Sequence, residues 1–192
     1  MIKKISVLAL GLFMLAGCVA YQAVDPNESI NISNRFNVSP QIAWAKQTAV
    51  GSKDTIWTAD GVELNVLRFM PAVKEGDALI RQSGRRSEDI IPYKDDMLPN
   101  DVADLFVTDL TKLGYQGVSY ANLAPSSFAG DNGFRFDLTL STSGGLNMRG
   151  KVLASQRDGG LDAILFLAPS EYYYGRYAQT VERIFSSVKA AS

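Results

Sequence analysis

The spacing of hydrophobic residues changes near residue 114, and this change limits the folds that the chain can adopt. From Asn100 to Leu113 the apolar side chains recur every three or four residues, after Pro99 and before Gly114, which predicts an amphipathic helix. Beyond it the apolar residues alternate, which predicts strands over 115–123, 134–140, 146–155 and 161–167. Because short Gly-rich turns separate these strands, we expect antiparallel neighbours.

The N-terminal part of the domain is also expected to be rich in strands. Alternating apolar residues predict one strand over 30–38, and the clearest hairpin joins 55–58 to 62–69 around Asp60-Gly61. Residues 41–48 fit either a short helix or a strand. The polar stretch 71–96, broken by glycine and proline, indicates a long surface excursion.

The chain is expected to finish with a second helix. Between Ser170 and Lys189 the apolar side chains fall on one helical face. The order of strands, helix, four strands and helix predicts an α+β fold, in which helices pack on an antiparallel sheet. We expect one such domain over residues 31–192.

A targeting signature precedes the domain. Lys3 and Lys4 are followed by an apolar run over 5–14, which is too short to span a membrane because a spanning helix needs about 20 residues. The following Leu-Ala-Gly-Cys at 15–18 resembles the lipobox of bacterial lipoproteins. The resemblance implies cleavage between Gly17 and Cys18, with acylation of the Cys18 thiol and of the new amino terminus. A plain cleavable signal would leave the position of the cysteine unexplained.

The acylated cysteine and the residue after it indicate how the protein is attached and to which membrane. Two or three acyl chains give durable attachment, because each buried methylene contributes about 0.8 kcal/mol. In the lipoproteins that this segment resembles, an Asp after the cysteine favours the inner membrane, and this chain has Val19. The resemblance therefore implies the periplasmic face of the outer membrane, with the inner membrane as the alternative. Residues 18–30 have no sustained period and are expected to be a tether.

Composition excludes several kinds of function. The chain has no histidine, and Cys18 is its single cysteine. Ser-His-Asp and Cys-His catalysis are therefore impossible within this chain, and the commonest zinc and copper ligands are missing. Without residues 1–17 the chain carries 17 basic and 20 acidic residues, a net charge of −3, and no basic stripe. We therefore expect no nucleic-acid partner and assign no cofactor, metal site or catalytic residue.

Candidate catalytic groups have simpler structural explanations. A glycosidase-type pair would need two carboxylates in one cleft, and the candidates are Asp60, Glu63, Asp95, Asp96, Asp131 and Glu171. Asp95 and Asp96, with Glu88 and Asp89 nearby, match no calcium-loop spacing. Ser126, Ser127 and Ser170 lack a lysine in Ser-x-x-Lys register.

Tyrosines at the start of the last helix form the candidate partner-binding site. Successive helical residues point about 100° apart, so at least one of Tyr172 and Tyr173 must point away from the buried face that Tyr174 and Tyr177 share. Together with Arg176, an outward tyrosine is typical of residues that carry interface energy. Packing of these rings under the preceding loop is the alternative.

Four antiparallel strands before an aromatic helix entry, with Ile-Phe-Ser-Ser at 184–187, resemble the Mog1/PsbP-like fold over roughly residues 31–189. The segments 57–61 (WTADG), 96–99 (DMLP), 130–134 (GDNGF) and 168–173 (APSEYY) are similar to a group of bacterial lipoproteins. Members of the fold are accessory, binding or assembly proteins more often than enzymes.

Three functions follow as hypotheses. The first is a non-catalytic, lipid-anchored envelope module that binds a protein or glycan partner or helps to assemble a complex. The second is a carboxylate-dependent glycan hydrolase. The third is a carrier of apolar ligands, with a cavity between sheet and helices lined by residues such as Phe134, Phe136 and Phe166.

Overall fold

The computed structural model describes residues 21–48, 54–81 and 91–191. The strands of these segments are β1 (Tyr21–Val24), β2 (Ile30–Ile32), β3 (Phe36–Val38), β4 (Trp44–Thr48), β5 (Thr55–Thr58), β6 (Val66–Val73), β7 (Gln116–Phe128), β8 (Asp131–Ser141), β9 (Asn147–Gln156), β10 (Leu161–Pro169) and β11 (Lys189–Ala190). The helices are α1 (Pro99–Lys112) and α2 (Tyr173–Ser186).

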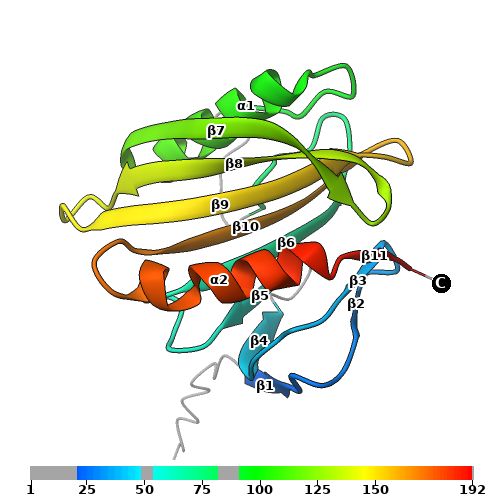
Figure 1. Cartoon of the computed structure of the whole chain (residues 1–192). Helices are drawn as coiled ribbons and strands as arrows, with labels where there is room; N and C mark the ends of the chain where they lie inside the picture. The colour runs from blue at the N-terminus through cyan, green and yellow to red at the C-terminus, as the bar shows by residue number, and fades with distance from the viewer. Residues whose placement is uncertain (1–20, 49–53, 82–90, 192) are drawn as a thin grey trace, which may run out of the picture.

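An antiparallel sheet with the strand order β1-β4-β5-β6-β10-β9-β8-β7 organises the described residues (Figure 1). After β6 the chain passes through α1 to the far edge at β7, and then returns strand by strand. The return ends where β10 pairs with β6, in a register that places Phe166 opposite Leu67. The predicted α+β fold with an antiparallel sheet is therefore confirmed, and so are the four successive strands.

Strand β10 lies at the centre of the fold, and each of its residues is buried. Leu165 and Leu167 join the core cluster that contains α1, whereas Ile164 and Phe166 join the cluster that contains α2. Because neighbouring side chains on a strand point to opposite faces, the helices cover opposite faces of the sheet. Figure 1 shows α2 across the front of the sheet, with α1 at the top behind β7.

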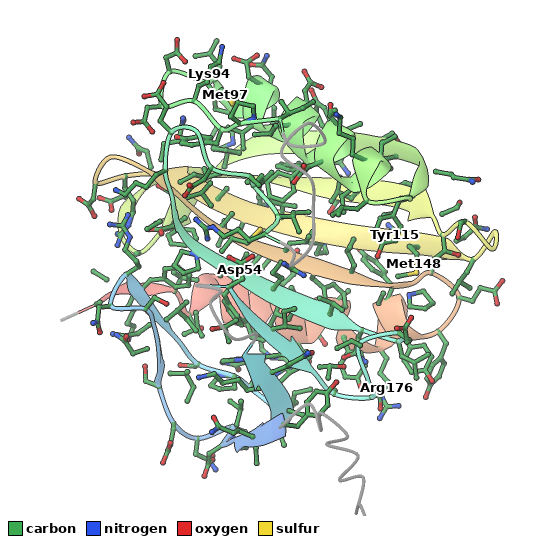
Figure 2. All side chains as sticks on the ribbon, turned by 180° about the vertical axis from the view of Figure 1, so that it is seen from behind. Asp54, Lys94, Met97, Tyr115, Met148 and Arg176 are labelled. Atoms are coloured by element: carbon green, nitrogen blue, oxygen red, sulfur yellow. The ribbon has the colours of Figure 1, made fainter. Side chains whose placement is uncertain are left out.

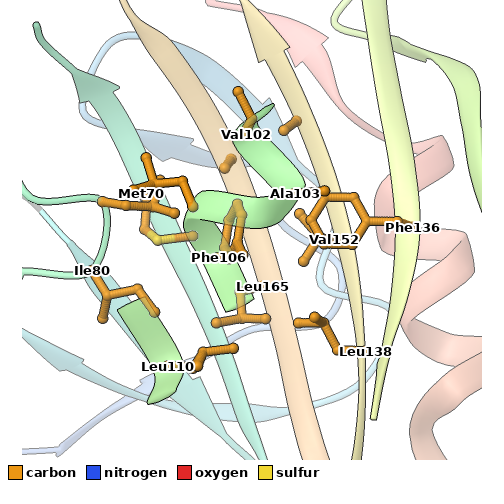
Figure 3. Close-up of a cluster of buried hydrophobic side chains, with 14 of the residues drawn as sticks. Met70, Ile80, Val102, Ala103, Phe106, Leu110, Phe136, Leu138, Val152 and Leu165 are labelled. Atoms are coloured by element: carbon orange, nitrogen blue, oxygen red, sulfur yellow. The ribbon is translucent and has the colours of Figure 1, made fainter. Parts of the chain in front are cut away.

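The predicted helix over 100–113 is confirmed as α1. Pro99 occupies its first position, where the missing N–H breaks no hydrogen bond, and the Asp101 carboxylate accepts the Leu98 N–H at 2.8 Å. Phe106 packs edge-on against Phe136 of β8, with ring centroids 5.5 Å apart. Figure 3 shows Phe106 among the aliphatic side chains of this cluster.

Helix α2 is shorter at both ends than the predicted helix over 170–189. Strand β10 continues to Pro169, so the helix begins at Tyr173. It ends at Ser186, because β11 leaves the helix and pairs with β3. The strands β11, β3 and β2 form a separate small sheet in the described part of the chain.

The predicted hairpin around Asp60-Gly61 is confirmed, but its second strand begins later than expected. Strands β5 and β6 pair with Trp57 opposite Leu67. Before β6, Asn65 organises the connection, because its Oδ1 accepts the Ala59 N–H at 2.7 Å. The second strand therefore begins at Val66, and not at Val62.

Two expectations for the N-terminal segment were wrong. The strand expected over 30–38 is a hairpin of β2 and β3, because Ser33 and Asn34 adopt positive φ angles of 50° and 56°. The tether expected over 18–30 includes β1, which pairs with β4, and β2 begins at Ile30. The residues of β1 show no sustained hydrophobic period in the sequence. They form a strand because β4 supplies their hydrogen-bond partners. The ambiguous stretch 41–48 contains strand β4.

The surface excursion expected over 71–96 was also wrong for the residues described. Strand β6 extends to Val73, and the side chains of Leu79, Ile80 and Tyr93 are buried in the α1 cluster. An isolated bridge between Ala78 and Pro92 closes this segment. A few apolar side chains anchor an otherwise polar stretch beneath the helix.

The segment 15–18 that resembles a lipobox, including Gly17 and Cys18, lies outside the described residues, so the predicted cleavage and acylation stay predictions. Glu88 and Asp89 also lie outside them. Within the described segments, no helix has both the length and the apolar character needed to cross a bilayer.

Candidate partner-binding groove

The candidate partner-binding residues Tyr172, Tyr173 and Arg176 lie at the beginning of α2. Tyr172 is 59 % exposed, whereas Tyr173 packs partly against the core. Their rings meet edge to face, with centroids 5.1 Å apart. The outward direction expected for at least one of these tyrosines is therefore found for Tyr172.

Arg176 lies one helical turn after Tyr172 and is exposed at the surface (Figure 2). Its Cζ atom lies 5.8 Å from the centroid of the Tyr172 ring and 5.3 Å from that of Tyr177. Such cation–π contacts contribute about 0.5–1 kcal/mol at exposed sites. They hold the guanidinium and the Tyr172 ring in a defined arrangement.

A shallow groove of about 430 Å³ runs beside these residues. One wall comes from the segment before β4, one from the turn after β5, and one from α2. Its lining residues are Ile42, Ala43, Ala59, Asp60, Arg176, Tyr177 and Thr180. The groove therefore combines a small apolar floor with a carboxylate and a guanidinium.

A hydrogen bond between Tyr177 and Asp60 fixes the carboxylate in the groove. The Tyr177 hydroxyl donates to Asp60 Oδ2, and Asn65 Nδ2 donates to the same oxygen at 3.1 Å. Burial and this hydrogen bond raise the pKa of Tyr177 to about 12, so its hydroxyl remains a donor at neutral pH. The Trp44 ring packs against the Tyr177 ring, with centroids 5.9 Å apart.

Two polar groups of the groove are available to form hydrogen bonds or an ion pair with an external ligand. Among the described residues, Asp60 Oδ1 accepts no hydrogen bond and Arg176 forms no ion pair with a carboxylate. A partner can therefore donate to Asp60 and accept from Arg176 without breaking an internal ion pair. The arrangement is suited to binding by complementary contacts.

The acidic residues considered for hydrolysis lie in different surroundings. Asp60 lines the groove and Glu63 lines a separate cavity near α1. Asp131 pairs with Arg157 at 2.8 Å, and Asp95 and Asp96 are exposed near Tyr93. Glu171 is exposed before α2. The described residues hold no group of three or more potential metal-ligating side chains.

The candidate serines are also separated. Ser126 and Ser127 line a cavity of about 180 Å³ whose charged lining residues are Arg135 and Glu182. Ser170 lies at the end of β10, where its hydroxyl donates to the Asn147 carbonyl at 3.1 Å. This hydrogen bond gives Ser170 a structural explanation.

A charged cluster that sequence reasoning missed joins the sheet to α2. Lys151 Nζ lies 3.1 Å from Asp137 Oδ1 and 2.8 Å from Glu182 Oε1. Burial alone would raise the pKa of Asp137, but hydrogen bonds from Asn122 and Lys151 lower it. A carboxyl held ionised in this way is a poor general acid. No local signal predicts the cluster, because its residues come from β7, β8, β9 and α2.

The aromatic rings that the carrier hypothesis places around a cavity are packed in the described structure. Phe134 and Phe136 belong to the α1 cluster, and Phe166 belongs to the α2 cluster and is fully buried. The planes of Phe134 and Phe136 are nearly parallel, with centroids 6.5 Å apart. These three rings therefore do not form the cavity that the carrier hypothesis requires of them, because strand alternation directs them into the cores that the helices close.

Comparison with known proteins identifies the fold. No family model and no curated protein matches the chain. The solution structure of cyanobacterial PsbP (CyanoP) from Synechocystis sp. PCC 6803 superposes with a TM-score of 0.55 at 12 % identity, over 94 % of this chain and 98 % of that one. The chain therefore has a PsbP-like α+β fold, as the resemblance implied, and this low identity bears on the fold alone.

A second solved structure aligns less well. It is the crystal structure of LpqN, involved in cell envelope biogenesis of Mycobacterium tuberculosis. The match covers 90 % of this chain and 92 % of that one at 10 % identity, with a TM-score of 0.37. At that score the likeness carries no argument about this chain.

Proposed function

We propose that this chain is a lipid-anchored envelope protein that binds a protein partner, without catalysis, through the groove beside Tyr172 and Arg176. The single observation that carries the binding role is the pair of available polar groups, Asp60 Oδ1 and the Arg176 guanidinium, beside an exposed and oriented Tyr172. The lipobox at 15–18 supports the anchor.

A protein partner fits this surface better than a glycan does. A sugar would stack on a free face of an aromatic ring, but Arg176 lies over the Tyr172 ring and Tyr173 contacts it edge to face. Tyrosine and arginine are the residue types enriched where protein interfaces hold their binding energy. Because the Tyr172 ring is already ordered, binding loses little side-chain entropy.

The position of the anchor favours a partner at the same membrane surface. Cys18 lies three positions before Tyr21, and an extended chain spans at most about 3.6 Å per residue. An acylated Cys18 would therefore hold β1 within about 11 Å of the headgroups. Strand β1 pairs with β4, and Ile42 and Ala43 of the groove directly precede β4. Val19 after Cys18 favours the outer membrane.

Site-specific photocrosslinking in cells tests the partner. A benzoylphenylalanine at position 172 is expected to capture one defined protein, whereas the same probe at the exposed Leu146 is not. Arg176→Glu is expected to reduce the crosslink at least tenfold. The matched charge reversal Lys112→Glu, at the exposed end of α1, is expected to leave it unchanged.

Other results would contradict the proposal. A crosslink that survives Arg176→Glu would show that the captured protein does not use the groove, and capture of glycan alone would replace the protein partner. Intact mass tests the anchor separately. The mature protein is expected to carry acyl chains at Cys18 that Cys18→Ser removes, and an unmodified thiol would overturn the membrane assignment.

A further inference from the structure

A second cavity lies between the last turns of α1 and the sheet, on the opposite face of the sheet from α2. Its volume is about 290 Å³, near the lower end of the range of small-molecule sites. Figure 3 shows three of its residues, Ile80, Leu110 and Leu165, at one end of the α1 core. In Figure 2, Tyr115 and Met148 lie close together in the same region.

The apolar side chains of the lining come from elements that are already packed. Leu110 and Leu113 come from the end of α1, Met148 from β9, and Leu165 and Leu167 from β10. Because the sheet extends beyond the end of α1, these side chains meet around open space. A hydrocarbon chain placed in this space would be removed from water, at about 0.8 kcal/mol for each buried methylene.

A guanidinium and a phenol supply hydrogen-bond donors in the same cavity. Arg68 uses Nη1 for Asp54 Oδ2 at 3.1 Å and for the Arg81 carbonyl at 3.0 Å. Its Nε and Nη2 groups, and the Tyr115 hydroxyl, have no hydrogen-bond partner among the described residues. Burial raises the pKa of Tyr115, so the hydroxyl keeps its proton at neutral pH.

The unused N–H groups of Arg68 favour a negatively charged acceptor. Asp54 Oδ2 lies 3.1 Å from Arg68 Nη1, and Asp54 Oδ1 lies 2.8 Å from Arg81 Nη1. Arg81 Nη2 has a second carboxylate, Asp77, at 3.2 Å. These carboxylates leave Nε and Nη2 of Arg68 available as charged donors. Arginine binds carboxylates in two-point geometry, and such charged hydrogen bonds are about twice as strong as neutral ones. Glu63 lines the same cavity but is exposed, so water screens its charge.

We propose that this cavity binds a medium-chain carboxylate, with the hydrocarbon chain against Leu113, Met148 and Leu165 and the carboxylate at Arg68 and Tyr115. The volume equals about ten waters at about 30 Å³ each, which suits a chain of about ten carbon atoms. The site is separate from the groove on α2, so its failure would leave the proposed partner binding unaffected.

Calorimetric titration with decanoate tests the proposal. All described helices, strands and core residues lie between Tyr21 and Ala190, so residues 18–192 with Cys18→Ser provide the complete described fold without acyl chains. Decanoate is expected to bind at one site, and decanol about tenfold more weakly, because it cannot form the charged hydrogen bonds. Thermal unfolding of each variant checks that it is folded.

Variants connect binding to the cavity. Tyr115→Phe is expected to weaken decanoate binding about fivefold and to leave decanol unchanged, whereas the control Tyr120→Phe, against Phe136, changes neither. Leu113→Trp, which fills the cavity from its partly buried rim, is expected to abolish binding of both ligands. Arg68→Gln is expected to remove the preference for decanoate.

Several outcomes would overturn the assignment. Equal affinities for decanoate and decanol would remove the role of Arg68 and Tyr115. Binding that persists in Leu113→Trp would place the ligand elsewhere. Phosphatidylglycerol vesicles distinguish a lipid headgroup from a free carboxylate, and binding to vesicles without binding of free decanoate would contradict the proposal.

Discussion

Arg35 Nη2 lies 3.0 Å from Asp162 Oδ2, and the Asp162 side chain is fully buried. Arg35 belongs to the turn between β2 and β3, whereas Asp162 belongs to β10 at the centre of the large sheet. Arg157 Nε donates to the same oxygen at 2.9 Å, and the Ala72 N–H donates to Oδ1 at 2.8 Å. This buried carboxylate therefore joins the small sheet to the large one.

Removing the Asp162 charge is expected to destabilise the fold strongly. Asp162→Asn leaves the guanidinium groups of Arg35 and Arg157 without their buried counter-charge, a change that costs about 3–5 kcal/mol. Urea unfolding measures the loss. Asp158→Asn is the control, because Asp158 is 68 % exposed at 3.5 Å from Arg35, and it is expected to cost less than about 1 kcal/mol. Equal effects of the two variants would contradict the central role of Asp162.

Tyr177 is expected to make the fold sensitive to alkaline pH. Its pKa is raised from 10.0 to about 12, so the stability that it contributes is fully present below pH 10 and is lost as the pH rises toward 12. Tyr177→Phe is expected to cost about 1 kcal/mol at neutral pH and to flatten this alkaline loss. Unfolding across this range, with Tyr21→Phe on the exposed edge as control, measures the difference. An unchanged slope would argue against the Tyr177–Asp60 hydrogen bond.

Asp137 is expected to make the stability of the fold depend on pH in the acidic range. Because its hydrogen bonds lower its pKa below the ordinary 3.8, its contribution is present above that value and is lost as the pH falls through the folded-state pKa. Asp137→Asn is expected to lower the free energy of unfolding by about 1 kcal/mol at neutral pH, and by progressively less as the pH falls below 3.8. Asp104→Asn, an exposed carboxylate on α1, serves as control. A difference that does not change with pH would contradict this prediction.

Gly150 on β9 is expected to resist substitution. A Cβ atom there would lie 2.6 Å from Leu167 Cδ2 and 2.7 Å from the Phe166 carbonyl oxygen, so Gly150→Ala is expected to destabilise by about 1–3 kcal/mol. Gly175 on α2 has no atom within 4 Å of the corresponding position. Gly175→Ala is therefore expected to stabilise by about 0.5–1 kcal/mol, through helix propensity. Thermal melting compares the two, and a tolerated Gly150→Ala would show that β9 can shift.

The elements that could be predicted from sequence have a strong local pattern. Helix α1 has apolar side chains at helical spacing between Pro99 and Gly114. The turn at Asp60-Gly61 was predictable because glycine adopts the positive φ that Gly61 shows, 108°. The outward direction of one of Tyr172 and Tyr173 followed from the geometry of a helix.

The errors arose where order depends on a distant partner. Tyr21–Val24 carries no sustained period, and it is a strand because β4 supplies its hydrogen bonds. Tyr93 lies in a polar stretch, but it is buried under α1. Sequence reasoning found Asp60 and Arg176 separately, and could not bring them to one groove because they lie far apart in the chain.

The sequence by itself determined the absence of histidine chemistry and the succession of strands and helices, and it predicts an export signature, because each depends on residue type or on spacing over one element. Only the tertiary structure decided which strand lies beside β6, which face each helix covers, and which polar side chains keep free hydrogen-bonding groups. These features depend on contacts between residues far apart in the chain, and the local pattern of a strand or helix does not encode its distant partner.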